Sequence, residues 1–185
     1  MKKEIDEIGF YAVEDWSVED FYTFFHQLNI LYNRLAVLED IREKKSPVKL
    51  KNALYGSLSR IPIEERLQIK SVEIHSPGDF NLLGLDKIII QVRGLIKDLT
   101  YQNRLDREAK ETQLRHDNEM NEVKVASAKL DLLEQQIKVM KDLGYDQGQI
   151  DIGIKALSDP LDQIANISQR KQVTLKSPNR VAGGI

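Results

Sequence analysis

The chain has 185 residues, with 27 basic and 29 acidic side chains, a formal net charge of −2 and no cysteine. This composition excludes disulfides, thiolate metal sites and cysteine nucleophiles, and it provides no overall positive field to attract nucleic acid or anionic lipid. The chain starts without the apolar core of a secretory signal, and its most apolar window is broken by charged residues, so we expect a cytoplasmic protein with no membrane-spanning segment.

The N-terminal part of the sequence predicts a helical head. Ser17 is a typical N-cap residue, and Trp16 before it can pack on Phe21 as a hydrophobic staple. From Phe21 to Leu38 apolar residues recur every three or four positions, which predicts one buried helix face. Ser46-Pro47 ends this helix and is expected to begin a second, shorter one.

Residues 67–83 predict a β-hairpin that packs on the head. The alternation of apolar residues changes phase near Lys70-Ser71, so either a bulge lies there or only half of the run is a strand. Ser76, Pro77 and Gly78 predict a type II turn, because proline fixes one φ and glycine supplies a positive φ at the next position. His75 and Ser76 would point to opposite faces of a strand, so we interpret this pair as the edge of a turn and not as a base and nucleophile.

From about residue 85 to residue 143 no proline interrupts the sequence, which predicts one long helix with a polar middle. Towards its end, apolar residues step alternately by three and four positions and form a coiled-coil seam. The seam consists of Val123, Ala126, Leu130, Leu133, Ile137 and Met140. It would pair with a second copy or with a helix of a partner, and the open alternative is that it folds back on the C-terminal helices as an intramolecular bundle.

Two short helices are predicted after Gly144, divided near Ser158-Asp159-Pro160. The stretch from residue 169 to residue 185 contains cations and no acid, which predicts a mobile basic tail. Its cations are the candidate contacts to an anionic partner: Arg170, Lys171, Lys176 and Arg180.

Nothing in the sequence indicates catalysis, a metal or a cofactor. The three histidines, His26, His75 and His116, lack the spacing of metal ligands, and no glycine-rich nucleotide motif occurs. An enzyme would have to gather His26 or His75 with a carboxylate in a pocket of the folded head, which the sequence alone does not indicate.

These patterns predict a mostly α protein with a minor β hairpin. Residues 1–99 would form the helical head, residues 100–168 the extended helix and a C-terminal helical pair, and residues 169–185 the tail. We expect a non-catalytic interaction or scaffold protein that self-associates or binds a helical partner. The alternative is a regulatory or adaptor subunit of a bacterial-type multi-protein system, which docks nucleic acid or a catalytic partner through the tail or the head. Nucleic acid has the weaker support, because Glu39, Asp40 and Glu43 lie among the basic residues at the end of the first predicted helix.

Overall fold

The computed structural model describes residues 4–12, 15–45, 48–56, 61–73, 78–110 and 117–176, with the backbone alone for residues 100–110, 117–125 and 174. The protein is mostly helical, with a small antiparallel sheet. In chain order the elements are β1 (Ile5–Ala12), α1 (Val18–Lys44), α2 (Leu50–Tyr55), the 3₁₀ turn η2 (Ile63–Glu65), β2 (Gln68–Glu73), β3 (Gly78–Leu85), α3 (Asp86–Lys110), α4 (Asp117–Asp142), α5 (Gln147–Arg170) and β4 (Val173–Leu175).

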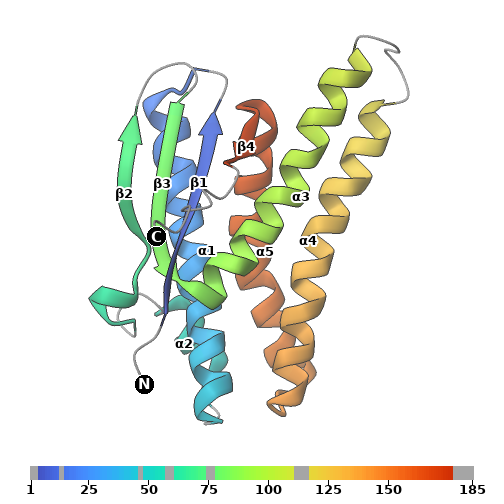
Figure 1. Cartoon of the computed structure of the whole chain (residues 1–185). Helices are drawn as coiled ribbons and strands as arrows, with labels where there is room; N and C mark the ends of the chain where they lie inside the picture. Colours follow the sequence, from blue (N-terminus) through green and yellow to red (C-terminus); the bar gives the residue numbers. More distant parts are fainter. Residues whose placement is uncertain are drawn as a thin grey trace, which may run out of the picture.

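The sheet has the strand order β2-β3-β1-β4, and all neighbouring strands are antiparallel. The predicted hairpin is confirmed as β2 and β3, and a register shift between Ile69 and Ser71 favours the bulge over the half-strand alternative. The sequence analysis did not predict β1, although Ile8, Phe10 and Ala12 are buried in strict alternation, which is the pattern of a strand with one face on the core. One face of the sheet covers α1 (Figure 1).

An aromatic layer joins this sheet face to α1. The ring of Phe10 lies 5.6 Å from that of Phe24, and the ring of Phe80 lies 5.4 Å from that of Phe25, measured between ring centroids. Trp16 adds to the layer and contacts Phe80 at 5.6 Å. These large side chains bury apolar surface on one face of the sheet, and this burial stabilises a sheet of three long strands and one short strand.

The start of α1 follows the prediction. Ser17 is the N-cap, and its hydroxyl accepts a hydrogen bond from the amide of Asp20 at 3.0 Å. Trp16 meets the ring of Phe21 at 6.4 Å, as expected of a staple. The next helix, α2, begins at Leu50 with Lys49 as its N-cap, which is later than the predicted start at Pro47.

The prediction of one long helix from residue 85 to residue 143 is wrong. The chain reverses between α3 and α4, which lie side by side and antiparallel (Figure 1). Two apolar stretches, Ile88–Leu99 and Leu132–Met140, would lie far apart on a straight helix, whereas the reversal lets both bury side chains in one core. The ends of α3 and α4 that are nearest the reversal belong to the polar middle of the expected helix.

The prediction of two short C-terminal helices is also wrong, because α5 is a single helix that continues through Pro160. It begins with a capping box between Asp146 and Gln149 and packs along α1. After α5 the chain forms β4, which pairs with Phe10–Ala12 of β1 and buries Val173 completely. Residues 169–176 are thus part of the fold where a mobile tail was expected, and residues 177–185 lie outside the described residues.

Within the described ranges, no helix combines the length and the apolar character that crossing a bilayer would require.

Candidate functional site

The structure divides the predicted seam of α4 between two environments. Met140 is fully buried, and Leu133 and Ile137 are partly buried against the core. Ala126 is exposed, and Leu130 keeps 55% of its surface exposed. The side chain of Val123 lies outside the described residues, so its predicted contact stays a prediction.

The buried row of α4 differs from the predicted seam. Ala128, Leu132, Gln136 and Met140 are buried, and they follow one another at intervals of four residues. The side-chain amide of Gln136 donates a hydrogen bond to Oε1 of Gln91 in α3 at 2.9 Å. This bond gives the buried amide nitrogen of Gln136 a partner between the two helices. Half of the predicted seam therefore packs within the chain, while Ala126 and Leu130 face outward.

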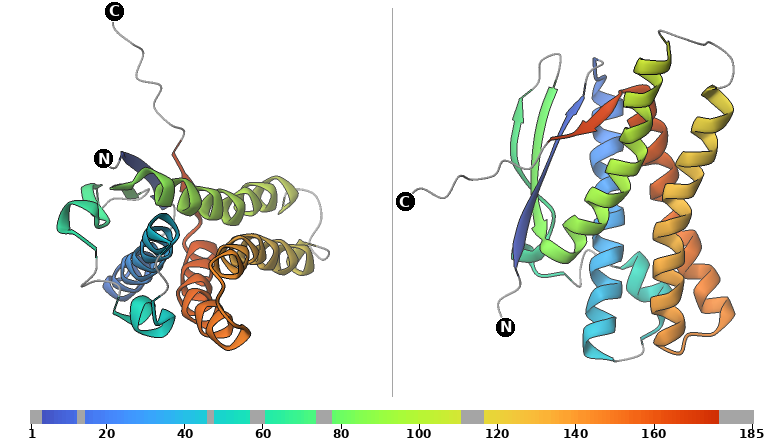
Figure 2. Two further views of the ribbon diagram at one scale, coloured as in Figure 1. Left: turned by 90° about the horizontal axis from the view of Figure 1, so that it is seen from below. Right: turned by 45° about the vertical axis from the view of Figure 1, so that its right-hand side comes forward.

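The ends of α3 and α4 at the chain reversal form an arm. In Figure 1 these ends rise at the upper right, and in Figure 2 they lie farthest from the sheet and lean away from α5. At their other ends α4 and α5 converge (Figure 1). The arm is therefore a pair of helices whose ends diverge from the third helix of the bundle (Figure 1).

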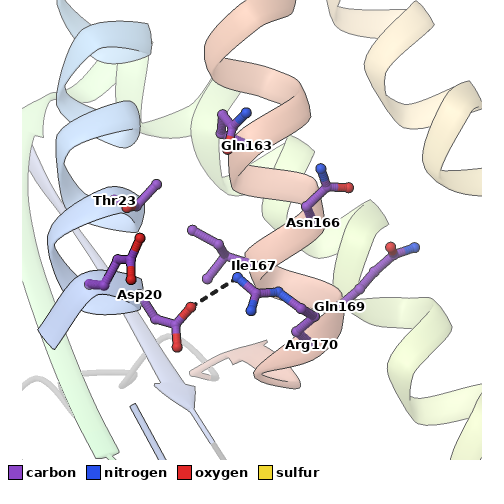
Figure 3. Close-up of a pocket in the computed structure, with 8 residues that line it drawn as sticks. Asp20, Thr23, Gln163, Asn166, Ile167, Gln169 and Arg170 are labelled. Carbon is purple, nitrogen blue, oxygen red and sulfur yellow. Dashed lines mark hydrogen bonds and ion pairs between the residues drawn. The ribbon is translucent and has the colours of Figure 1, made fainter. Parts of the chain in front are cut away.

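A polar groove of about 570 Å³ lies between the N-terminal half of α1 and the C-terminal half of α5 (Figure 3). Acids, amides and one cation line it. The lining residues are Glu19, Asp20 and Thr23 from α1, and Gln163, Asn166, Ile167, Gln169 and Arg170 from α5.

Asp20 is the electrostatic centre of this region. Its carboxylate accepts a hydrogen bond from the Ser17 hydroxyl at 2.7 Å and contacts the guanidinium of Arg170 at 2.9 Å and the ammonium of Lys171 at 3.0 Å. The Ser17 hydrogen bond, and after it the neighbouring cations, lower the pKa of Asp20 to about 2. The carboxylate is therefore ionised at neutral pH, and it joins the start of α1 to the end of α5. A general base would need a pKa close to the working pH, so Asp20 is not suited to that role.

The three described cations of the expected anionic-partner site are paired with acids of the same chain. Arg170 and Lys171 contact Asp20, and the ammonium of Lys176 contacts Asp79 on the solvent side of the sheet. Lys176 also lies 5.0 Å from the centre of the Tyr11 ring, and its amide donates to the carbonyl of Gly9 at 2.9 Å. A phosphate would have to compete with these ion pairs.

Lys176 lies close over Gly9. A Cβ on Gly9 would lie 2.7 Å from Cδ of Lys176 and 2.6 Å from Oδ1 of Asn81, so a larger residue here would require these two side chains to shift. The sequence analysis had no signal for this contact, because the two residues lie at opposite ends of the chain. Arg180, the fourth cation, lies outside the described residues.

Of the remaining candidate residues, the structure describes His26 and Gly78. His26 is exposed and stacks on Tyr22 at 5.2 Å between ring centroids. Among the residues that the structure describes, no group of three or more histidines and acids could hold a metal ion. Gly78 is the first residue of β3 and pairs with Ala12, whereas His75, Ser76, Pro77 and His116 lie outside the described residues.

Comparison of the chain with protein-family models, with curated proteins and with solved structures finds no match.

Proposed function

We propose that this is a non-catalytic interaction protein that binds another helix, foremost that of a second copy, through the outer face of α4. The observation that carries the proposal is the exposure of Leu130 on a helix that leaves the body of the protein. A single exposed leucine is common on protein surfaces, so the argument depends on its neighbours along the helix.

Leu130 belongs to a continuous apolar row. Ala126, Leu130, Leu133 and Ile137 are spaced by four, three and four residues, which places them on one face of α4. The first two are exposed and the last two are half-buried, so the row emerges gradually from the core toward the arm. A partner helix laid along this row would cover apolar surface without disturbing the buried row at Ala128, Leu132 and Met140.

The charges beside the row suit a second helix. In the heptad that places Leu130 and Ile137 at a, Lys129 occupies g and Glu134 occupies e. Glu134 is exposed, and Lys129 contacts Asp162 of α5 at 2.6 Å while keeping 24% of its side chain exposed. In a parallel pair of α4 helices the g position of one copy meets the e position of the other, so Lys129 and Glu134 would attract each other across the interface.

Sedimentation equilibrium over a wide concentration range tests the proposal. The unmodified protein should associate, and Leu130→Lys should shift it to the monomer while its helical circular dichroism stays unchanged. The matched control is Ile63→Lys, because Ile63 is 73% exposed and lies in η2, outside α4. An unmodified protein that remains monomeric, or a Leu130→Lys protein that associates as strongly, contradicts self-association through this face.

A further inference from the structure

We propose a second interaction site, at the free edge of β2, where an extended segment of a partner protein adds a further strand to the sheet. The strand order β2-β3-β1-β4 leaves β2 and β4 as the two edge strands. The site is distinct from the outer face of α4 and does not depend on self-association. Three features support it: the difference between the two edges, the position of Lys70 and the exposure of Ile69.

The chain covers the β4 side of the sheet with its own groups. β4 pairs with Phe10–Ala12 of β1, and α3 packs against β4. Beyond this short strand, the carbonyl of Gly9 accepts a hydrogen bond from the amide of Lys176 at 2.9 Å. The carbonyl of Glu7 accepts one from the guanidinium of Arg93 at 2.6 Å. This side of the sheet is therefore closed to another strand.

β2 forms the opposite edge and has no comparable cover. It is the outermost strand, on the side of the sheet away from α3 and α5 (Figures 1 and 2). All its residues except Val72 are exposed. Within the described ranges, no hydrogen bond reaches the outward main-chain groups of Gln68–Val72. The N–H and C=O groups of this edge are complementary to the main chain of another extended segment, which identifies a strand as the occupant.

Lys70 does not protect this edge in the usual way. Natural sheets commonly block a free edge with a proline or with a lysine that projects from it. β2 contains no proline, and the ammonium of Lys70 contacts Glu7 of β1 at 2.5 Å. Because β3 lies between β2 and β1, the lysine side chain extends inward over the sheet. An added strand would therefore meet the register shift between Ile69 and Ser71, which interrupts the edge once, but not the Lys70 charge.

Ile69 provides an apolar contact for the added strand. It lies opposite Leu82, and Val72 lies opposite Phe80; Leu82 and Phe80 are both buried. Opposite residues share one face of a sheet, so Ile69 and Val72 are on the face that carries the core. Ile69 nevertheless keeps 58% of its surface exposed, since β2 is the last strand. A strand added there would place an aliphatic or aromatic side chain beside Ile69 and cover it.

Other partners fit this edge less well. The main-chain groups of a helix are bonded within the helix, so a helix cannot pair with β2. A nucleic acid would need a cation, and Lys70, the cation of β2, already contacts Glu7. Two copies of β2 paired about a two-fold axis within Ser71–Glu73 would meet the register shift at both ends of the paired stretch, whereas a segment of another protein meets it once.

Selection from a phage-displayed library of random octapeptides on the full-length protein tests the proposal. The unmodified protein should select peptides with β-branched or aromatic residues at alternate positions, the composition of strands. One selected synthetic peptide should then slow the amide hydrogen exchange of Gln68–Glu73 and leave that of α5 unchanged. Failure to enrich such peptides, or protection that excludes β2, overturns the proposal.

A lysine at the edge should block the site. By fluorescence polarisation, Ile69→Lys should weaken binding of the selected peptide by roughly tenfold, because the added strand loses its apolar contact and meets a projecting charge. Ile5→Lys is the matched control, since Ile5 is 50% exposed and lies in β1, which does not border β2. This variant should bind as the unmodified protein does. Equal losses in the two variants contradict a site on β2.

N-methylation of the peptide tests main-chain pairing. A strand added to β2 directs every second N–H toward it, so methylation of one alternate set of amides should abolish binding and methylation of the other set should leave it intact. Equal effects of the two sets would indicate binding without a ladder and overturn the proposal. Protection of β2 that rises with protein concentration in the absence of peptide would identify a second copy as the occupant, and it would overturn the proposal as well.

Discussion

Arg34 of α1 donates a hydrogen bond from its guanidinium to the main-chain carbonyl of Ala156 in α5. In a regular helix the amide of residue 160 would donate to this carbonyl, but residue 160 is proline and has no N–H. Arg34 therefore replaces the donor that Pro160 lacks. We expect this replacement to stabilise α5 as one helix where its sequence indicates a break.

A double-mutant cycle between Arg34 and Pro160 should reveal this compensation. Arg34→Met should lower the free energy of unfolding by about 1–3 kcal/mol, because it leaves the Ala156 carbonyl without its donor. In a Pro160→Ala background the helix supplies its own N–H, so the same substitution should cost about 1 kcal/mol less. Urea unfolding of the four proteins measures the coupling.

The second contact of Arg34 serves as an internal control in this cycle. Its guanidinium lies 5.0 Å from the ring centre of Tyr55, and this contact is lost equally in both backgrounds. Strictly additive effects of the two substitutions would show that Arg34 does not compensate for the proline.

Gly153 and Gly94 should respond oppositely to alanine. A Cβ on Gly153 would overlap the sulfur of Met140, so α4 and α5 approach each other closely at this point. Gly153→Ala should destabilise the protein by about 1–3 kcal/mol, the usual cost of overpacking. Gly94 in α3 has open space where a Cβ would lie, so Gly94→Ala should stabilise by up to about 1 kcal/mol through helix propensity. Thermal unfolding measures the melting temperatures of both variants. Equal changes in the two melting temperatures would contradict the close approach of α4 and α5 at Gly153.

Local signals predicted the parts of this fold that depend on neighbouring residues. The N-cap at Ser17, its staple with Trp16 and the hairpin of β2 and β3 all involve residues close in sequence. The donor that replaces the missing N–H of Pro160 comes from Arg34, which lies 122 residues before Ala156, and no local pattern carries that information. The same reasoning explains the pairing of Asp20 with Arg170, which joins residues 150 positions apart.

The division of the predicted α4 seam between core and surface could not be predicted for a different reason. A heptad pattern identifies an apolar face but does not say which side of it meets the rest of the chain. The buried row at Ala128, Leu132 and Met140 is rotated from the expected seam, because α4 packs between α3 and α5 at once. Leu130 is consequently the better residue for testing association, since Leu133 packs on the core and its replacement by aspartate would also destabilise the fold.

Asp20 should make the fold sensitive to acid. Its pKa is about 2 in the folded protein and 3.8 in its ordinary state, so the folded form binds its proton less tightly. A lowered pKa means that the stabilisation is present above about pH 4 and is lost as the pH falls from about 4 to about 2. At neutral pH, Asp20→Asn should have a lower melting temperature than the unmodified protein. Its melting temperature should fall less than that of the unmodified protein between about pH 4 and about pH 2. Melting temperatures at several pH values measure this, and parallel curves for the two proteins would contradict it.

The buried hydroxyl of Tyr32 should stabilise the fold at neutral pH, and this stabilisation should be lost in alkali. Its hydroxyl accepts a hydrogen bond from the amide of Leu85 at 2.6 Å and donates one to the carbonyl of Glu65 at 2.7 Å, and its side chain is fully buried. Tyr32→Phe should therefore cost about 1–3 kcal/mol, because the Leu85 amide loses its partner inside the protein. The matched control is Tyr22→Phe, since Tyr22 is 64% exposed and its hydroxyl has no hydrogen bond among the described residues; it should cost little.

The pH dependence separates this role of Tyr32 from simple packing. Burial raises the pKa of Tyr32 to about 12, whereas an unfolded tyrosine titrates near 10. Because the pKa is raised in the folded state, the stabilisation is complete below about pH 10 and is lost as the pH rises from about 10 to about 12. The difference in unfolding free energy between the unmodified protein and Tyr32→Phe should shrink across this interval. A constant difference would mean that the hydroxyl is not buried in its neutral form and that the loss in Tyr32→Phe has another cause.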